Sequence, residues 1–371
     1  MKYIVLFLLF VNVFISNSLL ANSFSITKQT PSNDFKINTN TEHLCKVAKS
    51  TVKYLSRGKD YDPAVIHTQK LSQYGIENDD ITRTLKSLCN FAKADEKNNT
   101  QKLTDIQFLK QHYDFYRISS DTSHAKTLSD KKLLLKKLTN DKVLMTKYYV
   151  HLAKGSDKKT QSHAYPLYAI PYDESALSIE EAEQQKNTLT RFKYGKQSIL
   201  NGVLDFHKLA EPLVYLTRED LESALLQGTI VVELNDKQRV YNVHRNNGIA
   251  YDRTIKPFKQ NRYWYFKQVN GILGYGKDAN YKIEVLPEVT FAGDIYQLGL
   301  GALIFAQFDF KNHSEYRMAI MADTGGAFEN NLYQLDYLAG SYPGIKAYYD
   351  ANRHMPYYID AWFMVLKGDT K

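Results

Sequence analysis

The sequence lacks the patterns that mark several large classes of enzyme. Its ten histidines are not spaced as zinc ligands are. No predicted strand runs into a glycine-rich phosphate loop, and no Gly-x-Ser-x-Gly nucleophile elbow occurs. We therefore expect neither a metal nor a cofactor.

Long hydrophobic runs are missing after the first 15 residues. The run Ile4–Ile15 follows Lys2, and the small-residue pattern Ala21–Ser23 suits cleavage, so residues 1–23 predict a secretory signal peptide. The run is short for a membrane span, and no cysteine stands near the cleavage site for acylation as a lipoprotein. We expect an exported protein of the periplasm, or one associated with the outer membrane, and leave its oligomeric state open.

Cysteine is scarce, since Cys45 and Cys89 are the two thiols of the chain. Both fall on predicted helices near the mature N-terminus. In an oxidising compartment a disulfide between them would close a loop of about 44 residues and stabilise the fold by roughly 3–4 kcal/mol. The alternative is a pair of buried free thiols, and export favours the disulfide.

Positive charge is not gathered into one arm of the chain, although the formal net charge is +8. The lysines are scattered, as in Lys131–Lys137 and Lys154–Lys159, which is typical of a solvated surface. For an exported protein this charge also suits peripheral association with the cell wall or a membrane surface. The export signal and the lack of a recognition motif argue against nucleic acid.

The length of 371 residues and a hydrophobic content of 43% allow a large core and two or three domains. Residues 24–40 are polar and predict a loose leader. Helical spacing follows up to about residue 139, and we expect these helices to act as packing scaffold. They begin at Thr41, at Asp62-Pro63, near Ile81, at Thr104 and at Ser129.

From residue 142 onward the pattern changes to short strands. The predicted elements are the strand Val143–Leu152, the extended segment Tyr165–Pro171, the helix Arg218–Gln227 between Thr217 and Gly228, and a hairpin with an Asn235–Asp236 turn. From Arg262 to the end we expect short strands alone, Tyr281–Val285 among them. Short strands with glycine turns and no βαβ rhythm predict a β-barrel.

Three aspartates stand beside glycine-bearing turns at strand ends. Asp323 precedes Gly325-Gly326, where we expect a sharp turn because glycine alone adopts positive φ without a steric cost. Asp336 opens the next apolar run, and Asp294 precedes a further strand. Carboxyl groups that converge at one mouth of a barrel repel each other, which raises the pKa of at least one and suits it to proton transfer. The alternative is a loop whose aspartates cap backbone amides.

These residues resemble the signature of a known family. Asp294, Asp323-Thr-Gly-Gly-Ala327 and Asp336-Tyr-Leu-Ala-Gly340 are similar to the three-aspartate "3D" signature of the MltA-type lytic murein transglycosylases. Further similar segments follow the family's order: Thr146-Lys-Tyr-Tyr149, Tyr165-Pro-Leu-Tyr168, Gln227-Gly228, Asn247-Gly-Ile-Ala-Tyr251, Tyr265-Phe-Lys267 and Met364-Val-Leu-Lys367. The ordered set is far more specific than any single segment.

The resemblance implies a mainly β fold with an N-terminal helical block. The polar leader and helical block would occupy residues 24–141. Residues 142–150 and 245–371 would form a double-psi β-barrel, and residues 151–244 would form a second β-rich domain inserted into it. Peptidoglycan glycan strands would lie in the groove between the two.

The resemblance also implies a reaction, cleavage of the β-1,4 bond between N-acetylmuramic acid (MurNAc) and N-acetylglucosamine (GlcNAc) without water. The product carries a 1,6-anhydro end, because the C6 hydroxyl of the muramic sugar is the nucleophile. A single acid/base group then suffices, where most glycosidases need two carboxylates. By its place in the motif Asp336 would take that role, and Asp323 would support it.

A second set of residues would bind the substrate by lining or shaping the groove. These are Thr146, Tyr148, Tyr149, Gln227, Gly325, Gly326 and Asp294. Tyrosine faces stack on sugar rings, and a glutamine amide can hydrogen-bond an acetamido group. The alternatives are tyrosines that are half core, a glutamine that ends a helix, and an aspartate that caps a turn.

The sequence departs from the family pattern at several points. Lys147 replaces a glycine, Thr229-Ile230 replaces Ser-Gly, and Glu329-Asn330 replaces Lys-Gly. The altered sequel to the Gly-Gly pair leaves room for a second hypothesis, a catalytically inactive peptidoglycan-binding protein on the same scaffold. A third hypothesis, an exported β protein that binds calcium, is weaker because the aspartates lack the dense alternation of a calcium loop.

Overall fold

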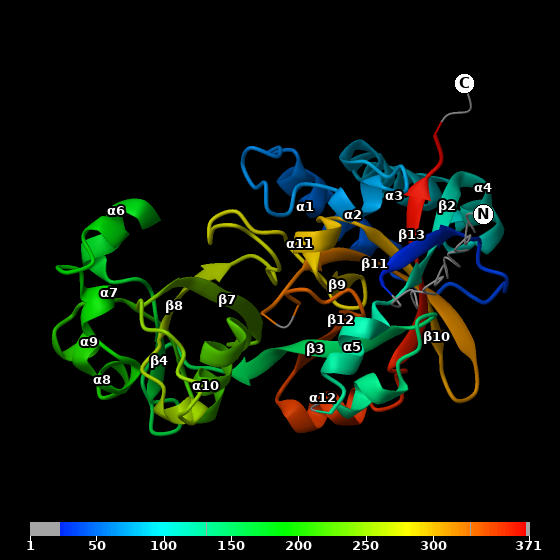
Figure 1. Ribbon diagram of the computed structural model, residues 1–371. Coiled ribbons are helices and arrows are strands. Elements are labelled where there is room, and N and C mark those ends of the chain that lie inside the picture. The colour runs from blue at the N-terminus through cyan, green and yellow to red at the C-terminus, as the bar shows by residue number, and fades with distance from the viewer. Residues whose placement is uncertain (1–22, 131, 327, 369–371) are drawn as a thin grey trace, which may run out of the picture.

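The computed structural model describes residues 23–130, 132–326 and 328–368. A larger and a smaller lobe lie side by side, and the mainly β fold with additional helices is confirmed (Figure 1). The predicted signal peptide, residues 1–23, lies outside the described residues apart from Ser23. Within the described ranges, no helix is both long and apolar enough to cross a bilayer.

Six strands of the described chain close into a ring in the larger lobe. They are β3 (Val143–Lys154), β9 (Thr290–Ala292), β10 (Leu303–Asp309), β11 (Ser314–Asp323), β12 (Gln334–Tyr342) and β13 (Tyr358–Leu366). Their order is β13-β10-β11-β9-β12-β3, and a further pairing of β13 with β3 closes the ring. Neighbouring residues such as Met318 and Ala319 are both buried, because helices cover the outer face of these strands.

The smaller lobe continues the same sheet. β6 (Thr229–Leu234) pairs in parallel with the end of β3, and β7 (Lys237–Asn246) and β8 (Trp264–Val269) follow it. The other elements of this lobe are β4 (Tyr165–Tyr168), β5 (Pro212–Leu216), α6 (Ile179–Gln184), α7 (Thr190–Lys193), α8 (Lys196–Leu200), α9 (Val203–Phe206), α10 (Arg218–Gln227) and the 3₁₀ turns η3 (Tyr172–Glu174) and η4 (Pro257–Lys259).

Two local predictions in the smaller lobe are confirmed. The Thr217 side chain accepts a hydrogen bond from the backbone of α10, and Gly228 ends that helix with φ of 80°. The β6–β7 turn holds Asn235 at φ 50° and Asp236 at φ 61°. These are the angles of a type I′ hairpin turn, which asparagine and aspartate tolerate.

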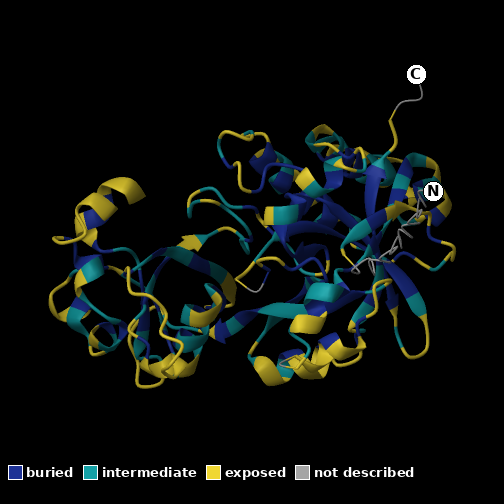
Figure 2. Ribbon diagram, viewed as in Figure 1, coloured by how far each residue is buried: buried dark blue, intermediate teal, exposed yellow. Residues whose placement is uncertain are grey.

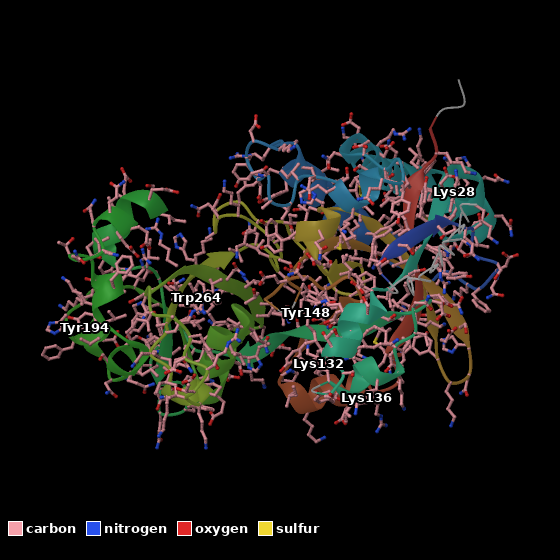
Figure 3. All side chains as sticks on the ribbon, viewed as in Figure 1. Lys28, Lys132, Lys136, Tyr148, Tyr194 and Trp264 are labelled. Carbon is pink, nitrogen blue, oxygen red and sulfur yellow. A yellow bond between two sulfur atoms is a disulfide. The ribbon has the colours of Figure 1, made fainter. Side chains whose placement is uncertain are left out.

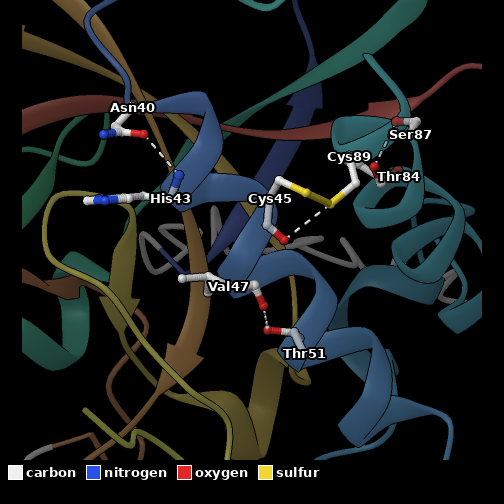
Figure 4. The surroundings of a disulfide bond; sticks show 8 residues. All are labelled: Asn40, His43, Cys45, Val47, Thr51, Thr84, Ser87 and Cys89. Carbon is white, nitrogen blue, oxygen red and sulfur yellow. Dashed lines mark hydrogen bonds between the residues drawn. A yellow bond between two sulfur atoms is a disulfide. The ribbon is translucent and has the colours of Figure 1, made fainter. Parts of the chain in front are cut away.

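The helical block packs over the outside of the ring. α1 (Thr41–Leu55) and α3 (Asn78–Asn98) contact each other, and they also contact β11 and β13 respectively. Cys45 on α1 and Cys89 on α3 are joined by a disulfide (Figure 4). The strands beneath these helices are buried, while the outer faces of the helices are exposed (Figure 2).

The segment 24–40 was predicted as a loose leader, and that prediction is wrong. β1 (Ser25–Lys28) pairs with β2 (Tyr113–Ser119), and Ile37 is buried in the core. The helix expected from Thr104 ends as α4 (Ile106–His112), after the 3₁₀ turn η1 (Lys102–Thr104), because apolar residues then alternate with polar ones in β2. That two-residue period suits a half-buried strand.

The helix expected from Asp62-Pro63 shrinks to α2 (Gln69–Ser72). The carboxylate of Asp62 accepts hydrogen bonds from the hydroxyls of Tyr54 and Tyr275, at 2.7 and 2.9 Å, so it does not cap a helix. A tertiary contact therefore overrides the local helix signal.

Three further predictions need correction. The helix expected at Ser129 is the 3₁₀ turn η2 (Leu133–Lys137), preceded by a helix α5 (Thr122–Thr127) that was not predicted. The last section is not made of strands alone, since α11 (Ile295–Leu298) and α12 (Ile345–Asn352) interrupt it. Residues 281–285 make isolated bridges and loop contacts in place of a strand.

Candidate active site

The two aspartates singled out by their motif lie on either side of one small residue. In the ring, Ala292 of β9 is paired with Asp323 of β11 on one side and with Asp336 of β12 on the other. Asp336 is in turn paired with Thr146 of β3. Paired residues share a face of a sheet, and two strand spacings amount to roughly 10 Å between backbones, so both carboxyl groups can approach each other over the alanine methyl.

The turn after Asp323 is built by hydrogen bonds rather than by special glycine angles. The Thr324 backbone amide donates to Asp323 Oδ1 and the Thr324 hydroxyl donates to the Gly293 carbonyl, both at 2.8 Å. Neither Gly325 nor Gly326 has a positive φ, so the prediction of a turn that needs such angles is wrong. Both glycines are exposed, and Gly325 borders a groove that Asp323 and Asp336 also line.

Asp323 is held by the side chain of a groove tyrosine. The Tyr148 hydroxyl donates to Asp323 Oδ2 at 2.8 Å. Burial raises the pKa of Asp323 to about 6, against the lowering effects of Tyr148, the Thr324 amide and the positive charge of Lys282. Burial beside this carboxylate also raises the pKa of Tyr148 well above its usual value, so its hydroxyl remains a donor.

Asp336 is poised to carry a proton. Burial and, more weakly, the charge of Asp323 raise its pKa to about 6, while Thr146 and Lys147 lower it. Its Oδ1 atom is buried and has no hydrogen-bond partner among the described residues. Gln334 donates to the Thr146 hydroxyl oxygen at 2.7 Å, which fixes the hydroxyl beside the carboxyl. A buried carboxyl with a free oxygen and a pKa near neutrality is suited to general acid/base catalysis.

A groove of about 480 Å³ opens over both carboxyl groups. It lies at the junction of the lobes, where Tyr148 is labelled in Figure 3. Of the residues predicted to act in the site, the structure brings these to its walls: Asp323, Asp336, Tyr148, Tyr149, Gln227 and Gly325. Thr146 contributes indirectly, through its contact with Asp336.

Tyr149 and Gln227 are each fixed by a neighbouring group. The Tyr149 ring stacks on Tyr348 of α12, with the ring centroids 4.7 Å apart. The Gln227 side-chain oxygen accepts a hydrogen bond from the His151 backbone amide at 3.0 Å. The amide nitrogen of Gln227 has no partner within the described part of the chain, which leaves it free for a ligand acceptor.

Asp294 does not face the groove, which corrects its predicted place as a groove residue. It is buried, at 1% exposure, and caps α11 by accepting hydrogen bonds from the Gln297 amide and side chain. It also accepts from the Asn331 backbone amide at 2.9 Å. The third aspartate therefore anchors the segment between the other two, as the turn-capping alternative predicts.

Two lysines near the aspartates were missed as site residues by sequence reasoning. Lys282 lines the groove, lowers the pKa of Asp323 and donates to the Asn242 side chain of β7 at 3.0 Å. Lys147 lies 3.9 Å from the ring centroid of Tyr357, and burial lowers its pKa to about 8. Lys147 was recognisable as a departure from the family pattern, whereas no local signal marks Lys282.

The groove wall that carries Lys282 is held by the helical block. The Tyr275 hydroxyl from this wall and the Tyr54 hydroxyl from α1 share the carboxylate of Asp62. The backbone amide of Lys277 donates to the Tyr54 hydroxyl at 2.9 Å.

Within the described residues, no cluster of three or more His, Cys, Asp or Glu side chains could hold a metal ion.

The sequence model of the MltA specific insert domain matches residues 144–261. A comparison of the whole sequence with curated proteins gave no match.

Several solved structures share the fold of almost the entire chain. A membrane-bound lytic murein transglycosylase from Agrobacterium tumefaciens is 15% identical, with a TM-score of 0.56 over 92% of this chain and 97% of that one. Escherichia coli MltA with bound chitohexaose is 14% identical, with a TM-score of 0.54 over 93% and 95%. Neisseria gonorrhoeae MltA is 14% identical, with a TM-score of 0.55 over 88% and 89%. The chain therefore carries the MltA specific insert domain on the MltA fold, which confirms the resemblance to MltA-type lytic murein transglycosylases expected from its motifs.

Proposed function

We propose that this protein is an exported lytic transglycosylase that cleaves the MurNAc-β-1,4-GlcNAc bond of peptidoglycan and leaves 1,6-anhydro-MurNAc ends. The observation that carries the proposal is the carboxyl group of Asp336, a residue that lines the groove. Its Oδ1 atom is buried without a hydrogen-bond partner among the described residues, and its pKa is raised to about 6. The MltA fold supports it, and so does the chitohexaose bound to the E. coli relative, which favours a glycan strand as the ligand.

In this reaction Asp336 acts first as an acid and then as a base. Its proton passes to the glycosidic oxygen as the bond from that oxygen to C1 of MurNAc breaks. The C6 hydroxyl oxygen of the same sugar bonds to C1, and its proton passes to the Asp336 carboxylate, which ends as it began. The charge of Asp323 favours the protonated form of Asp336 at the start of this cycle.

The finer architecture belongs to the same proposal. We assign the closed ring to the double-psi class, with residues 142–150 and 245–371 in the barrel domain and 151–244 in the inserted domain. The helical block, residues 24–141, includes the contacts that hold one wall of the groove. Residues 1–23 would direct export to the periplasm or the outer membrane and then be removed.

Digestion of purified murein sacculi by the mature chain tests the proposal. Mass spectrometry of the soluble products should find anhydro-muropeptides with the wild type and none with Asp336→Ala. The control Asp236→Asn changes an exposed carboxyl at the tip of the β6–β7 hairpin and should leave the yield unchanged. The rate should fall as the pH rises through about 6, because the first step needs protonated Asp336.

Binding to sacculi without release of anhydro products would refute catalysis and favour the inactive wall-binding protein. Release of reducing ends by hydrolysis would instead refute the proposed use of the C6 hydroxyl.

A further inference from the structure

A second cavity, of about 320 Å³, lies on the smaller lobe next to the groove. Both are bordered by Gln227 and Gly228 at the end of α10 and by Val243 of β7. The two spaces therefore adjoin at these three residues, over which a branch of a ligand in the groove would pass to reach the second cavity. We call this space the side cavity.

The side cavity combines apolar surface with one unpaired cation. Leu226 and Tyr251 border it and are 69% and 41% exposed, which is high for large hydrophobic side chains. The guanidinium of Arg262 lies 4.6 Å from the ring centroid of Trp264, whose position in the smaller lobe is labelled in Figure 3. Arg262 has no hydrogen bond or ion pair to any other described residue, so its donors face the cavity or solvent.

The other charged pair in the side cavity is already satisfied. Lys196 is 2% exposed, and its ammonium group donates to Glu222 at 2.7 Å and to the Pro257 carbonyl at 2.9 Å. Arg218 also pairs with Glu222. Among the described residues that line this cavity, Arg262 is thus the cation that remains available to a ligand.

The segment that carries Arg262 is basic and firmly anchored. Residues 252–262 hold four basic side chains, Arg253, Lys256, Lys259 and Arg262, against one acidic side chain, Asp252. Hydrogen bonds from Lys196, Gln197 and Gln260 to backbone carbonyls of this segment fix its path. Of the four, Arg262 borders the side cavity, and a firmly held positive charge there favours anionic ligands at a small entropic cost.

We propose that the side cavity binds the peptide stem of the muramic residue, with Arg262 pairing with one of its carboxylates. The inference rests on the proposed function, because it takes the glycan backbone to lie in the groove. The glycan rings of peptidoglycan carry no charge, whereas the stem attached to the lactyl group of MurNAc carries carboxylates. An Arg–carboxylate pair supplies charge-assisted hydrogen bonds, and the apolar walls suit the methyl groups and aliphatic chains of the stem.

A binding comparison on two forms of the same polymer tests this assignment. The probes are glycan strands with tetrapeptide stems and the same strands after an amidase has removed the stems. The full mature chain carries Asp336→Asn in all cases, so that the strands are not consumed. We expect this chain to bind the stem-bearing form about tenfold more tightly, and Arg262→Gln to bring that ratio close to one.

Two further variants separate specific pairing from general charge. Arg253→Gln removes the same charge from an exposed position of the segment outside the side cavity, and it should keep the ratio. Arg262→Lys keeps the charge and should restore part of the ratio, which loss of folding would not allow.

An equal affinity for the two polymers, or a ratio that Arg262→Gln leaves unchanged, would overturn the assignment. Either result leaves the proposed function standing if the wild type still releases anhydro-muropeptides from sacculi. Failure of that release is the separate outcome that would remove the proposed function itself.

Discussion

The substitution Asp336→Asn should stabilise the folded protein near neutral pH while it abolishes cleavage. In the folded state the pKa of Asp336 is raised from 3.8 to about 6, mainly because the carboxyl is buried. The folded state therefore binds a proton more tightly than the unfolded state does. Stability conferred by that proton is present below pH 4 and is lost as the pH rises through about 6.

The size of the effect follows from the shift. A pKa difference of about two units corresponds to about 3 kcal/mol, which is the upper bound on the penalty for holding the ionised carboxylate in the site at pH 7. An uncharged asparagine of nearly the same shape removes this penalty, so the free energy of unfolding should rise by about 1–3 kcal/mol at pH 7. The gain should vanish as the pH approaches 4.

Urea denaturation of both proteins between pH 4 and 8, followed by circular dichroism, measures this difference. Asp294→Asn is the matched control, because Asp294 is a buried aspartate whose carboxylate accepts several hydrogen bonds. That variant should lose about 1–2 kcal/mol of stability. If Asp336→Asn is no more stable than the wild type at pH 7, the ionised carboxylate of Asp336 does not destabilise the folded protein. The argument from its raised pKa is then wrong.

Two other predictions concern the neighbours of the site and the helical block. Lys282→Met should raise the pKa of Asp323, because the charge of the lysine lowers that pKa. Titration of the Asp323 carboxyl carbon by NMR measures the change, and an unchanged pKa would contradict this electrostatic effect. Replacing Cys45 and Cys89 by serine should lower the free energy of unfolding, measured by urea denaturation, by about 3–4 kcal/mol, because it removes their disulfide. Reductant should destabilise the wild type but have no further effect on the variant. An equal response of the two proteins to reductant would contradict a stabilising role of the disulfide.

Local sequence signals predicted the elements whose structure depends on near neighbours. The helix α10 has its cap at Thr217 and its stop at Gly228, and the β6–β7 turn uses Asn235 and Asp236 as expected. The ordered motifs also indicated the family fold, and they singled out Asp323 and Asp336. Both of these residues line one groove in the structure. In these cases one or two residues set the backbone conformation, so the signal survives in the sequence.

Other features depend on partners far along the chain and could not be predicted. Asp62 was interpreted as a helix start, yet it binds tyrosines from α1 and from the groove wall. Asp294 has the same motif context as the two site aspartates, but it turns inward to cap α11. Lys282 reaches the groove from a loop that no periodic pattern describes, because its path is set by contacts with the helical block.

The strand β3 has a mechanical consequence for the proposed enzyme. Residues 144–151 of this strand pair with β12 in the ring, and residues 151–154 pair with β6 in the smaller lobe. The strand has no unpaired stretch between the two ladders, so the junction holds no free segment of β3 that could serve as a hinge. Any change in the width of the groove over Asp336 must therefore come from bending or twisting of β3 while both ladders stay paired.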